Sequence, residues 1–132
     1  RNPDLYHYII YSLQWFDLAS KGLANFHVTF LTRMTYYLGF WPNIDKRNML
    51  PFFDLKDSIA TDAEPEHNFF LKGEEVAIMP KLLRMNVRNM HRFLLTRQQR
   101  NRMLDVLTLY YQLHVPEFRD LRSLEVLREV LA

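Results

Sequence analysis

The stretch GLANFHVTFLTRMTYYLGF, residues 22–40, carries the clearest helical pattern of the sequence and sets the expected fold. Apolar side chains recur in it at steps of three and four, at Leu23, Phe26, Phe30, Met34 and Tyr37. This spacing places them on one face of a helix. Gly39 follows, where glycine commonly ends a helix. The stretch therefore predicts an amphipathic helix.

A helix is also predicted before this stretch, because Asn2 is placed as an N-cap and Pro3 takes the first helical position. After it, residues 44–73 break the helical pattern. Here FFDL, residues 52–55, and SIAT, residues 58–61, predict two short strands, and DAEPEH predicts a loop.

Helical spacing resumes at Glu74, and we expect a kink near Pro80. Over residues 81–94 the pattern predicts a helix with two stripes. The apolar stripe is formed by Leu83, Val87, Met90 and Leu94, and the cationic stripe by Lys81, Arg84, Arg88 and Arg92. Thr96 and Gln99 have the spacing of a capping box and predict a helix that runs to about residue 115, before Pro116. Ser123 is expected to cap a last helix.

The composition is that of one folded domain. The chain has 132 residues, is 48% hydrophobic and contains only three glycines, which favours helices over a turn-rich β-sandwich. We therefore expect an all-α fold: one compact helical domain over residues 1–132, with a short β-hairpin or extended insert near residues 52–61. The sequence lacks cysteine, which excludes disulfides and fits a reducing compartment.

Catalytic and cofactor motifs are not visible in the sequence. The five histidines have no metal-ligand spacing with one another. Asp62, Glu64, Glu66 and His67 are more simply interpreted as a solvated acidic loop than as a cation site. No serine lies in a nucleophile elbow, and the chain has no glycine-rich phosphate loop. We expect a protein that is not an enzyme and that takes no metal, no cofactor and no small-molecule substrate.

Five aromatic residues of the first predicted helix allow two interpretations. They are Tyr6, Tyr8, Tyr11, Trp15 and Phe16. Exposed rings can form a platform on which nucleic-acid bases stack. Because five rings on one helix must point all around it, we favour core packing, with exposed rings covering a neighbouring domain.

The cationic residues are unevenly distributed, although the net charge is only +2. Residues 61–80 hold one lysine and five acidic residues, whereas residues 81–102 hold seven cationic residues and no acidic one. The seven are Lys81, Arg84, Arg88, Arg92, Arg97, Arg100 and Arg102. A solvated helix face normally interleaves the two signs, which relieves repulsion.

The placement of Arg97 and Arg100 is also unusual, because the positive end of a helix dipole disfavours cations. We therefore predict that the seven cationic residues form a surface that binds an anion, either nucleic-acid phosphate or an acidic peptide. Pairing with the acidic residues between positions 62 and 75, across the tertiary structure, is the alternative.

Several stretches, in the same order, resemble the C-terminal part of the bacterial recombination mediator family RecO. They are LANFHVTFLTRMTYYLGFWPN, FFDL, LLRMNVRNMHRFLLTRQQRNRMLDVLTLYYQLHVPEF and SLEVLREVL. The most specific pieces are F-x-x-x-F-L leading into Y-L-G-F-x-P-N, and R-N-R-x-L-D followed by Y-Y-x-L-H. The resemblance implies a helical domain that follows an N-terminal OB-fold. Because the chain begins without an initiator Met, we expect a fragment that lacks this OB-fold.

The resemblance further implies a DNA repair and recombination mediator of the bacterial cytoplasm, associated with the nucleoid. Family members bind single- and double-stranded DNA and anneal complementary strands. With RecR they help to load the RecA recombinase onto DNA coated by the single-stranded-DNA-binding protein, SSB. Expected partners are therefore DNA, RecR and the acidic C-terminal tail of SSB, which ends in Phe, without a membrane. The alternative is a pure protein-docking module for SSB or RecR, without DNA binding of its own.

The chain departs from the family pattern at three places. Arg100 and Arg102 fall where relatives often have a basic residue and an arginine around a serine, which is Asn101 here. The two positions before Phe26 are often basic in relatives, but are Ala24 and Asn25 in this chain. Many relatives carry a four-cysteine zinc module at roughly residues 52–70, which this sequence cannot form.

Overall fold

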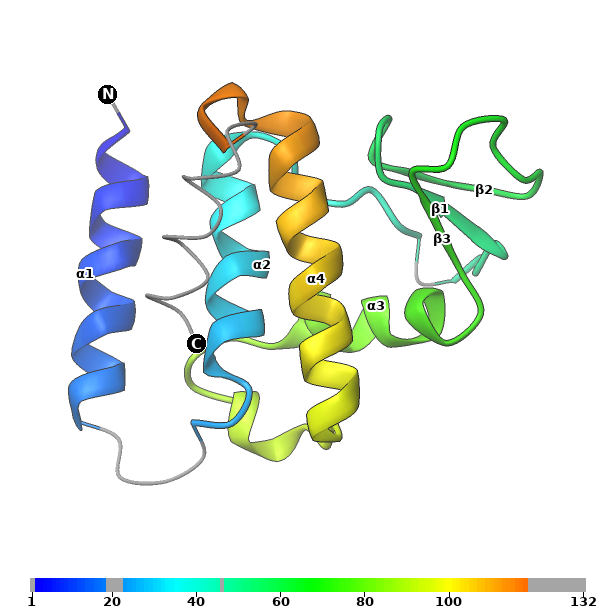
Figure 1. Ribbon diagram of the computed structural model, residues 1–132. Coiled ribbons are helices and arrows are strands. Elements are labelled where there is room, and N and C mark those ends of the chain that lie inside the picture. The colour runs from blue at the N-terminus through cyan, green and yellow to red at the C-terminus, as the bar shows by residue number, and fades with distance from the viewer. Residues whose placement is uncertain (1, 19–22, 46, 119–132) are drawn as a thin grey trace.

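The computed structural model describes residues 2–18, 23–45 and 47–118. Its α-helices over these residues are α1 (Pro3–Leu18), α2 (Phe26–Leu38), α3 (Glu74–Arg84) and α4 (Arg97–His114). Two short 3₁₀ turns, η1 (Met90–Arg92) and η2 (Pro116–Phe118), flank α4. Helix α2 lies between α1 and α4, and α3 crosses below α4, toward a small sheet (Figure 1).

The helix ends follow from local capping. The side chain of Asn2 accepts a hydrogen bond from the N–H of Leu5 at 3.1 Å. Gly39 ends α2 in the left-handed conformation, with φ of 94°, and its N–H donates to the carbonyl of Thr35. Thr96 and Gln99 form the predicted reciprocal capping box at the start of α4. These three predicted boundaries are confirmed.

The insert is a three-stranded antiparallel sheet with the order β2-β1-β3. Strand β1 (Phe52–Asp54) and strand β2 (Ile59–Thr61) form the hairpin expected from the sequence. Strand β3 (Phe70–Lys72) pairs with the other edge of β1 and was not predicted. The expected fold class, a helical domain with a short hairpin, is confirmed.

The predicted helix over residues 81–94 is wrong. Helix α3, which contains Pro80, ends at Arg84, and Met85 is extended. The Oδ1 atom of Asn86 accepts the N–H groups of Arg88 and Asn89, at 2.8 and 3.0 Å. The side chain of Asn89 in turn accepts the N–H of Asn86 and donates to the carbonyl of Arg84. These bonds close a turn where the helix was expected to continue.

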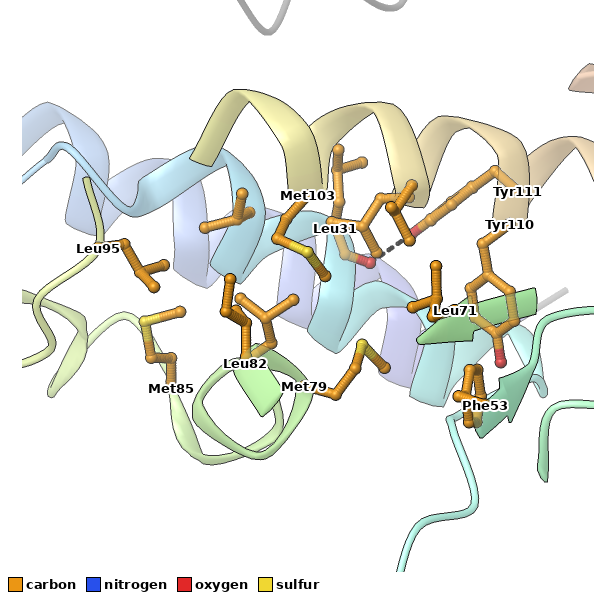
Figure 2. Close-up of a cluster of buried hydrophobic side chains, with 14 of the residues drawn as sticks. Leu31, Phe53, Leu71, Met79, Leu82, Met85, Leu95, Met103, Tyr110 and Tyr111 are labelled. Atoms are coloured by element: carbon orange, nitrogen blue, oxygen red, sulfur yellow. Dashed lines mark hydrogen bonds between the residues drawn. The ribbon is translucent and has the colours of Figure 1, made fainter. Parts of the chain in front are cut away.

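The core lies where α2, α3 and α4 meet the sheet (Figure 2). The largest fully buried side chains include those of Phe53, Leu82, Met103, Tyr110 and Tyr111. The hydroxyl of Tyr111 donates to the carbonyl of α2 residue Leu31 at 2.6 Å, so the buried phenol is satisfied. Burial raises the pKa of Tyr110 to about 12, which keeps its hydroxyl a donor.

The last predicted helix, capped by Ser123, lies outside the described residues. Within the described ranges, none of the helices has the length and apolar character needed to cross a membrane.

Candidate functional site

The predicted cationic stripe comes from several elements and is not one helix face. Lys81 and Arg84 belong to the last turn of α3, Arg88 to the turn that follows, and Arg92 to η1. Arg97, Arg100 and Arg102 lie on α4. The physical reason is the turn at residues 85–89, which ends the helix that the stripe assumed.

Residues 90–95, here called the strap, run past the N-terminal ends of α2 and α4, at the lower edge of the view in Figure 1. The Nδ2 atom of the buried Asn25 donates to the carbonyls of Met90 and Phe93, at 2.9 Å each. From the sequence, Asn25 stands out only because relatives often have a basic residue at this position. It anchors the strap to the start of α2.

Three of the seven cationic residues also hold the strap. Lys81 donates from Nζ to the carbonyl of Leu94 at 3.3 Å. Arg100 donates from Nη1 to the carbonyl of Leu95 at 2.6 Å. The guanidinium of Arg84 lies 5.6 Å from the ring centroid of Phe93, a cation–π distance. These three side chains therefore have an internal, structural role.

Arg102 has an acidic partner. Its Nε atom forms an ion pair with the carboxylate of Glu75, at the start of α3. The alternative that the sequence left open, pairing across the tertiary structure, thus applies to Arg102. Because the Arg102 side chain is more than half exposed, such a pair contributes only about 0–1 kcal/mol.

The cleft beside the first turn of α4 does not have the character of an anion site. It has a volume of about 420 Å³ and is lined by Glu74, Thr96, Gln98, Gln99 and Arg102. Arg102 is the one cation among the described residues of this lining, and it is already paired with Glu75, while Glu74 would repel an anion. The Gln99 N–H is also occupied, by the Thr96 hydroxyl at 3.0 Å.

Arg88, Arg92 and Arg97 differ from the other four cationic residues. All three are exposed. Among the described residues, none of their guanidinium groups has a hydrogen-bond or ion-pair partner. These three arginines keep their full capacity for an external anion.

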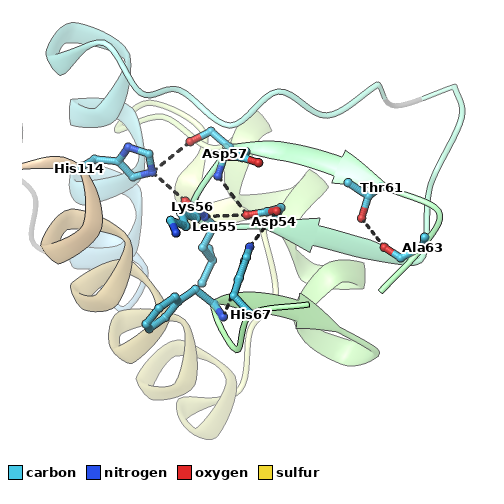
Figure 3. A network of polar contacts seen from close by, with 10 residues as sticks. Asp54, Leu55, Lys56, Asp57, Thr61, Ala63, His67 and His114 are labelled. Atoms are coloured by element: carbon cyan, nitrogen blue, oxygen red, sulfur yellow. Dashed lines mark hydrogen bonds and ion pairs between the residues drawn. The ribbon is translucent and has the colours of Figure 1, made fainter. Parts of the chain in front are cut away.

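A polar network centred on Asp54 connects residues of the insert (Figure 3). The carboxylate of Asp54 accepts the N–H groups of Lys56 and Asp57, at 2.9 and 3.0 Å, and contacts Nε2 of His67 at 3.0 Å. Because the Nδ1 atom of His67 accepts the N–H of Phe69, the ring hydrogen lies on Nε2 and points to Asp54. His67 is therefore a structural residue of the insert and not a member of a solvated loop.

The pKa of the Asp54 carboxyl reflects two opposing effects. Burial alone raises the pKa, but the N–H of Asp57, the ring of His67 and the N–H of Lys56 together lower it below the ordinary value. In the part of the chain that the structure describes, no three potential ligands are grouped as a metal site.

Ser58 and His114 lie close together but do not form a nucleophile–base pair. The Nε2 atom of His114 lies 2.7 Å from the carbonyl oxygen of Leu55 and 3.2 Å from Oγ of Ser58. A carbonyl only accepts, so Nε2 carries the hydrogen and cannot remove one from Ser58. The Tyr110 hydroxyl also bonds Ser58, at 2.8 Å. This network links the hairpin to α4 and was not found from the sequence.

The fold defines a helical domain with a small β insert and a partly unpaired cationic segment. The family model described as Recombination protein O C terminal matches residues 1–125, and the chain belongs to this family. This confirms the resemblance found in the sequence.

Curated relatives named DNA repair protein RecO match almost all of this chain. The DNA repair protein RecO of Phocaeicola vulgatus is 38% identical over 131 residues, which cover 99% of this chain and 54% of the relative. The proteins of the same name from Bacteroides fragilis and Christiangramia forsetii are each 36% identical, over 130 and 129 residues. These matches cover 98% of this chain and 54% and 53% of the relatives. The chain thus spans about half the length of its curated relatives. No solved structure matches it.

Proposed function

We propose that this chain is the helical part of a mediator of DNA repair and recombination, which helps to load a recombinase onto SSB-coated single-stranded DNA. Within it, the exposed cations of residues 81–102 supply a surface for DNA phosphate or an acidic partner such as the SSB tail or RecR. Family membership supports the repair role. The unpaired state of Arg88, Arg92 and Arg97 supports the binding surface.

An exposed arginine without an internal partner keeps all of its guanidinium donors for an external anion. Among the described residues, Arg88, Arg92 and Arg97 have no acidic partner, and residues 76–104 contain no acidic residue. A polyanion that pairs with these arginines releases counterions, which makes binding favourable and strongly dependent on salt. The other four cationic residues support this surface by holding the strap and α4 in place.

The test is a titration of the chain with duplex DNA, single-stranded DNA and an acidic peptide that ends in Phe, at several salt concentrations. The informative variant is Arg92→Ala combined with Arg97→Ala. If the surface binds phosphate, affinity for DNA of any sequence should fall. The slope of log affinity against log salt should decrease by roughly two for duplex DNA, one for each lost contact.

The matched control is Arg47→Ala, which removes an exposed arginine that lies outside residues 81–102. It should leave affinity and salt slope nearly unchanged. If the double variant binds DNA as the unmodified chain does, but loses the acidic peptide, the domain is a protein-docking module instead. If it retains both ligands, the proposed surface is wrong.

A further inference from the structure

A groove with a volume of about 600 Å³ lies between α1, α2 and the turn after α3. Its α1 side includes Asp4, His7 and Tyr11, at steps of three and four that place them on one helix face, together with the neighbouring Tyr8. Arg33 and Tyr37 of α2 face it, and Arg88 closes it from the turn. A groove of this volume accommodates a small organic ligand.

A column of stacked aromatic rings ends at the groove. The rings of Phe26, Phe30, Tyr8 and Tyr37 follow one another with centroids 5.7, 5.6 and 4.9 Å apart and interplanar angles of 14°, 14° and 22°. Phe26 and Tyr8 are buried, whereas Tyr37 is half-buried and lines the groove. The column fixes the orientation of the Tyr37 ring.

Tyr11 is an exposed ring of the groove, and its side chain is 43% exposed. Two tyrosines of α1 therefore differ in exposure, because Tyr8 packs in the column and Tyr11 remains accessible. Tyrosine rings that are held rigidly but remain accessible suit the stacking of a planar ligand.

The two arginines of the groove have different states. Arg33 is fixed, because Nη1 donates to the carbonyl of Met85 at 3.2 Å and the guanidinium lies 5.5 Å from the ring centroid of Trp41. Arg88 is exposed and has a free guanidinium among the described residues. Arg88 can therefore turn toward an anionic group at the mouth of the groove.

The chemistry of the walls decides which ligand fits. Among the described residues that line the groove, Val87 is the only aliphatic one, and the others present ring, amide, carboxylate and guanidinium groups. An aliphatic or phenylalanine anchor would leave these groups without partners. A nucleobase has an apolar face and polar edges, and the carboxylate of Asp4 can accept from an amino group on such an edge.

We propose that this groove binds one nucleotide unit of a single-stranded nucleic acid, with the base against Tyr11 and Tyr37 and the phosphate on Arg88. The inference deepens the proposed function, on which it rests, because it adds base contacts to a surface that otherwise recognises charge. It makes the domain prefer unstacked strands, since a base inside a duplex cannot enter the groove.

The test compares two labelled strands of about 12 nucleotides, one oligothymidylate and one abasic strand with the same phosphates. Both are titrated with the full 132-residue chain and its variants. The chain should bind oligothymidylate more tightly than the abasic strand. Tyr11→Ala should weaken oligothymidylate binding roughly 5- to 150-fold, the usual range for one stacked base, and leave abasic binding unchanged. Tyr11→Phe should restore it, and Arg88→Ala should weaken both strands.

The matched control is Tyr6→Ala, which removes a 63% exposed tyrosine of the same helix that does not line the groove. It should have no effect. The inference is overturned if Tyr6→Ala and Tyr11→Ala behave alike, or if the chain binds both strands equally. It is also overturned if Tyr11→Ala loses only the acidic peptide. In these cases the role of Arg92 and Arg97 in phosphate binding is judged separately by their double variant.

Discussion

The Nη1 atom of Arg100 lies 2.6 Å from the carbonyl oxygen of Leu95, five residues earlier in the chain. This bond runs from α4 back to the strap, so the arginine satisfies a carbonyl that lies before the first turn of its own helix. Arg97 lies one turn away on the same helix but is exposed and makes no such bond. The two arginines are therefore expected to respond differently to removal.

Arg100→Ala should lower the free energy of unfolding by about 1–2 kcal/mol, because a charge-assisted hydrogen bond to the strap is lost. Arg97→Ala, on the same helix, should change it by less than about 0.5 kcal/mol. Urea unfolding of both variants measures the difference. Equal stabilities would show that the Arg100 bond contributes nothing in solution.

Asn25→Ala should destabilise the domain by about 1–3 kcal/mol, because the carbonyls of Met90 and Phe93 both lose their side-chain donor. Amide hydrogen exchange over residues 90–95 should become faster than in the unmodified chain. Asn48→Ala, at an exposed asparagine, is the control and should leave both quantities unchanged. Unchanged exchange in the Asn25 variant would contradict the anchoring role.

Asp54 should make stability depend on pH in the acid range. Its pKa is lower in the folded chain than the ordinary value of 3.8, so the unfolded chain binds the proton more readily. The contribution of Asp54 is therefore complete above pH of about 3.8 and is lost as the pH falls through the folded pKa.

The measurement is urea unfolding of the unmodified chain and of Asp54→Asn between pH 7 and pH 3. The stability difference between them should be largest near neutral pH and shrink at the acid end. Asp57→Asn, at an exposed carboxylate of the same hairpin, should show a smaller difference. A difference for Asp54→Asn that is constant over this range would exclude the proposed linkage.

Tyr110→Phe should lower stability by about 1–3 kcal/mol. The buried hydroxyl donates to the carbonyl of Phe40 and also bonds Ser58, and phenylalanine leaves both without it. Tyr36→Phe, whose side chain is 62% exposed, should have little effect. Thermal unfolding of the pair is sufficient, and a Tyr110 variant as stable as the Tyr36 variant would contradict the prediction.

The parts of the fold that local chemistry determines were predictable from the sequence. Asn2, Gly39 and Thr96 end or begin helices through contacts within a few residues, and each was identified. The hairpin over residues 52–61 was found for the same reason. Strand β3 was missed because its partner β1 lies far away in the sequence, and three residues carry too little pattern.

The site was less predictable, because its residues are partnered across the tertiary structure. Three members of the predicted apolar stripe, Leu83, Val87 and Met90, are buried, yet the chain reaches them through a turn. The fourth member, Leu94, was wrongly expected on a buried face, because its side chain is 86% exposed. Asn86 and Asn89 were the overlooked signal, since asparagine side chains compete for backbone groups. The pairing of Arg102 with Glu75 depends on the fold and was only an alternative from the sequence, whereas the bond of Arg100 to the nearby Leu95 carbonyl was not considered.

The strap has a mechanical consequence. Its carbonyls are held from α2 by Asn25, from α3 by Lys81 and from α4 by Arg100. A displacement of the exposed Arg92, which belongs to the strap, is therefore opposed by contacts to three helices. Detaching the whole strap therefore requires the loss of contacts to all three helices. A ligand held by Arg92 would therefore be attached to a segment that is fixed to the helical core at several points.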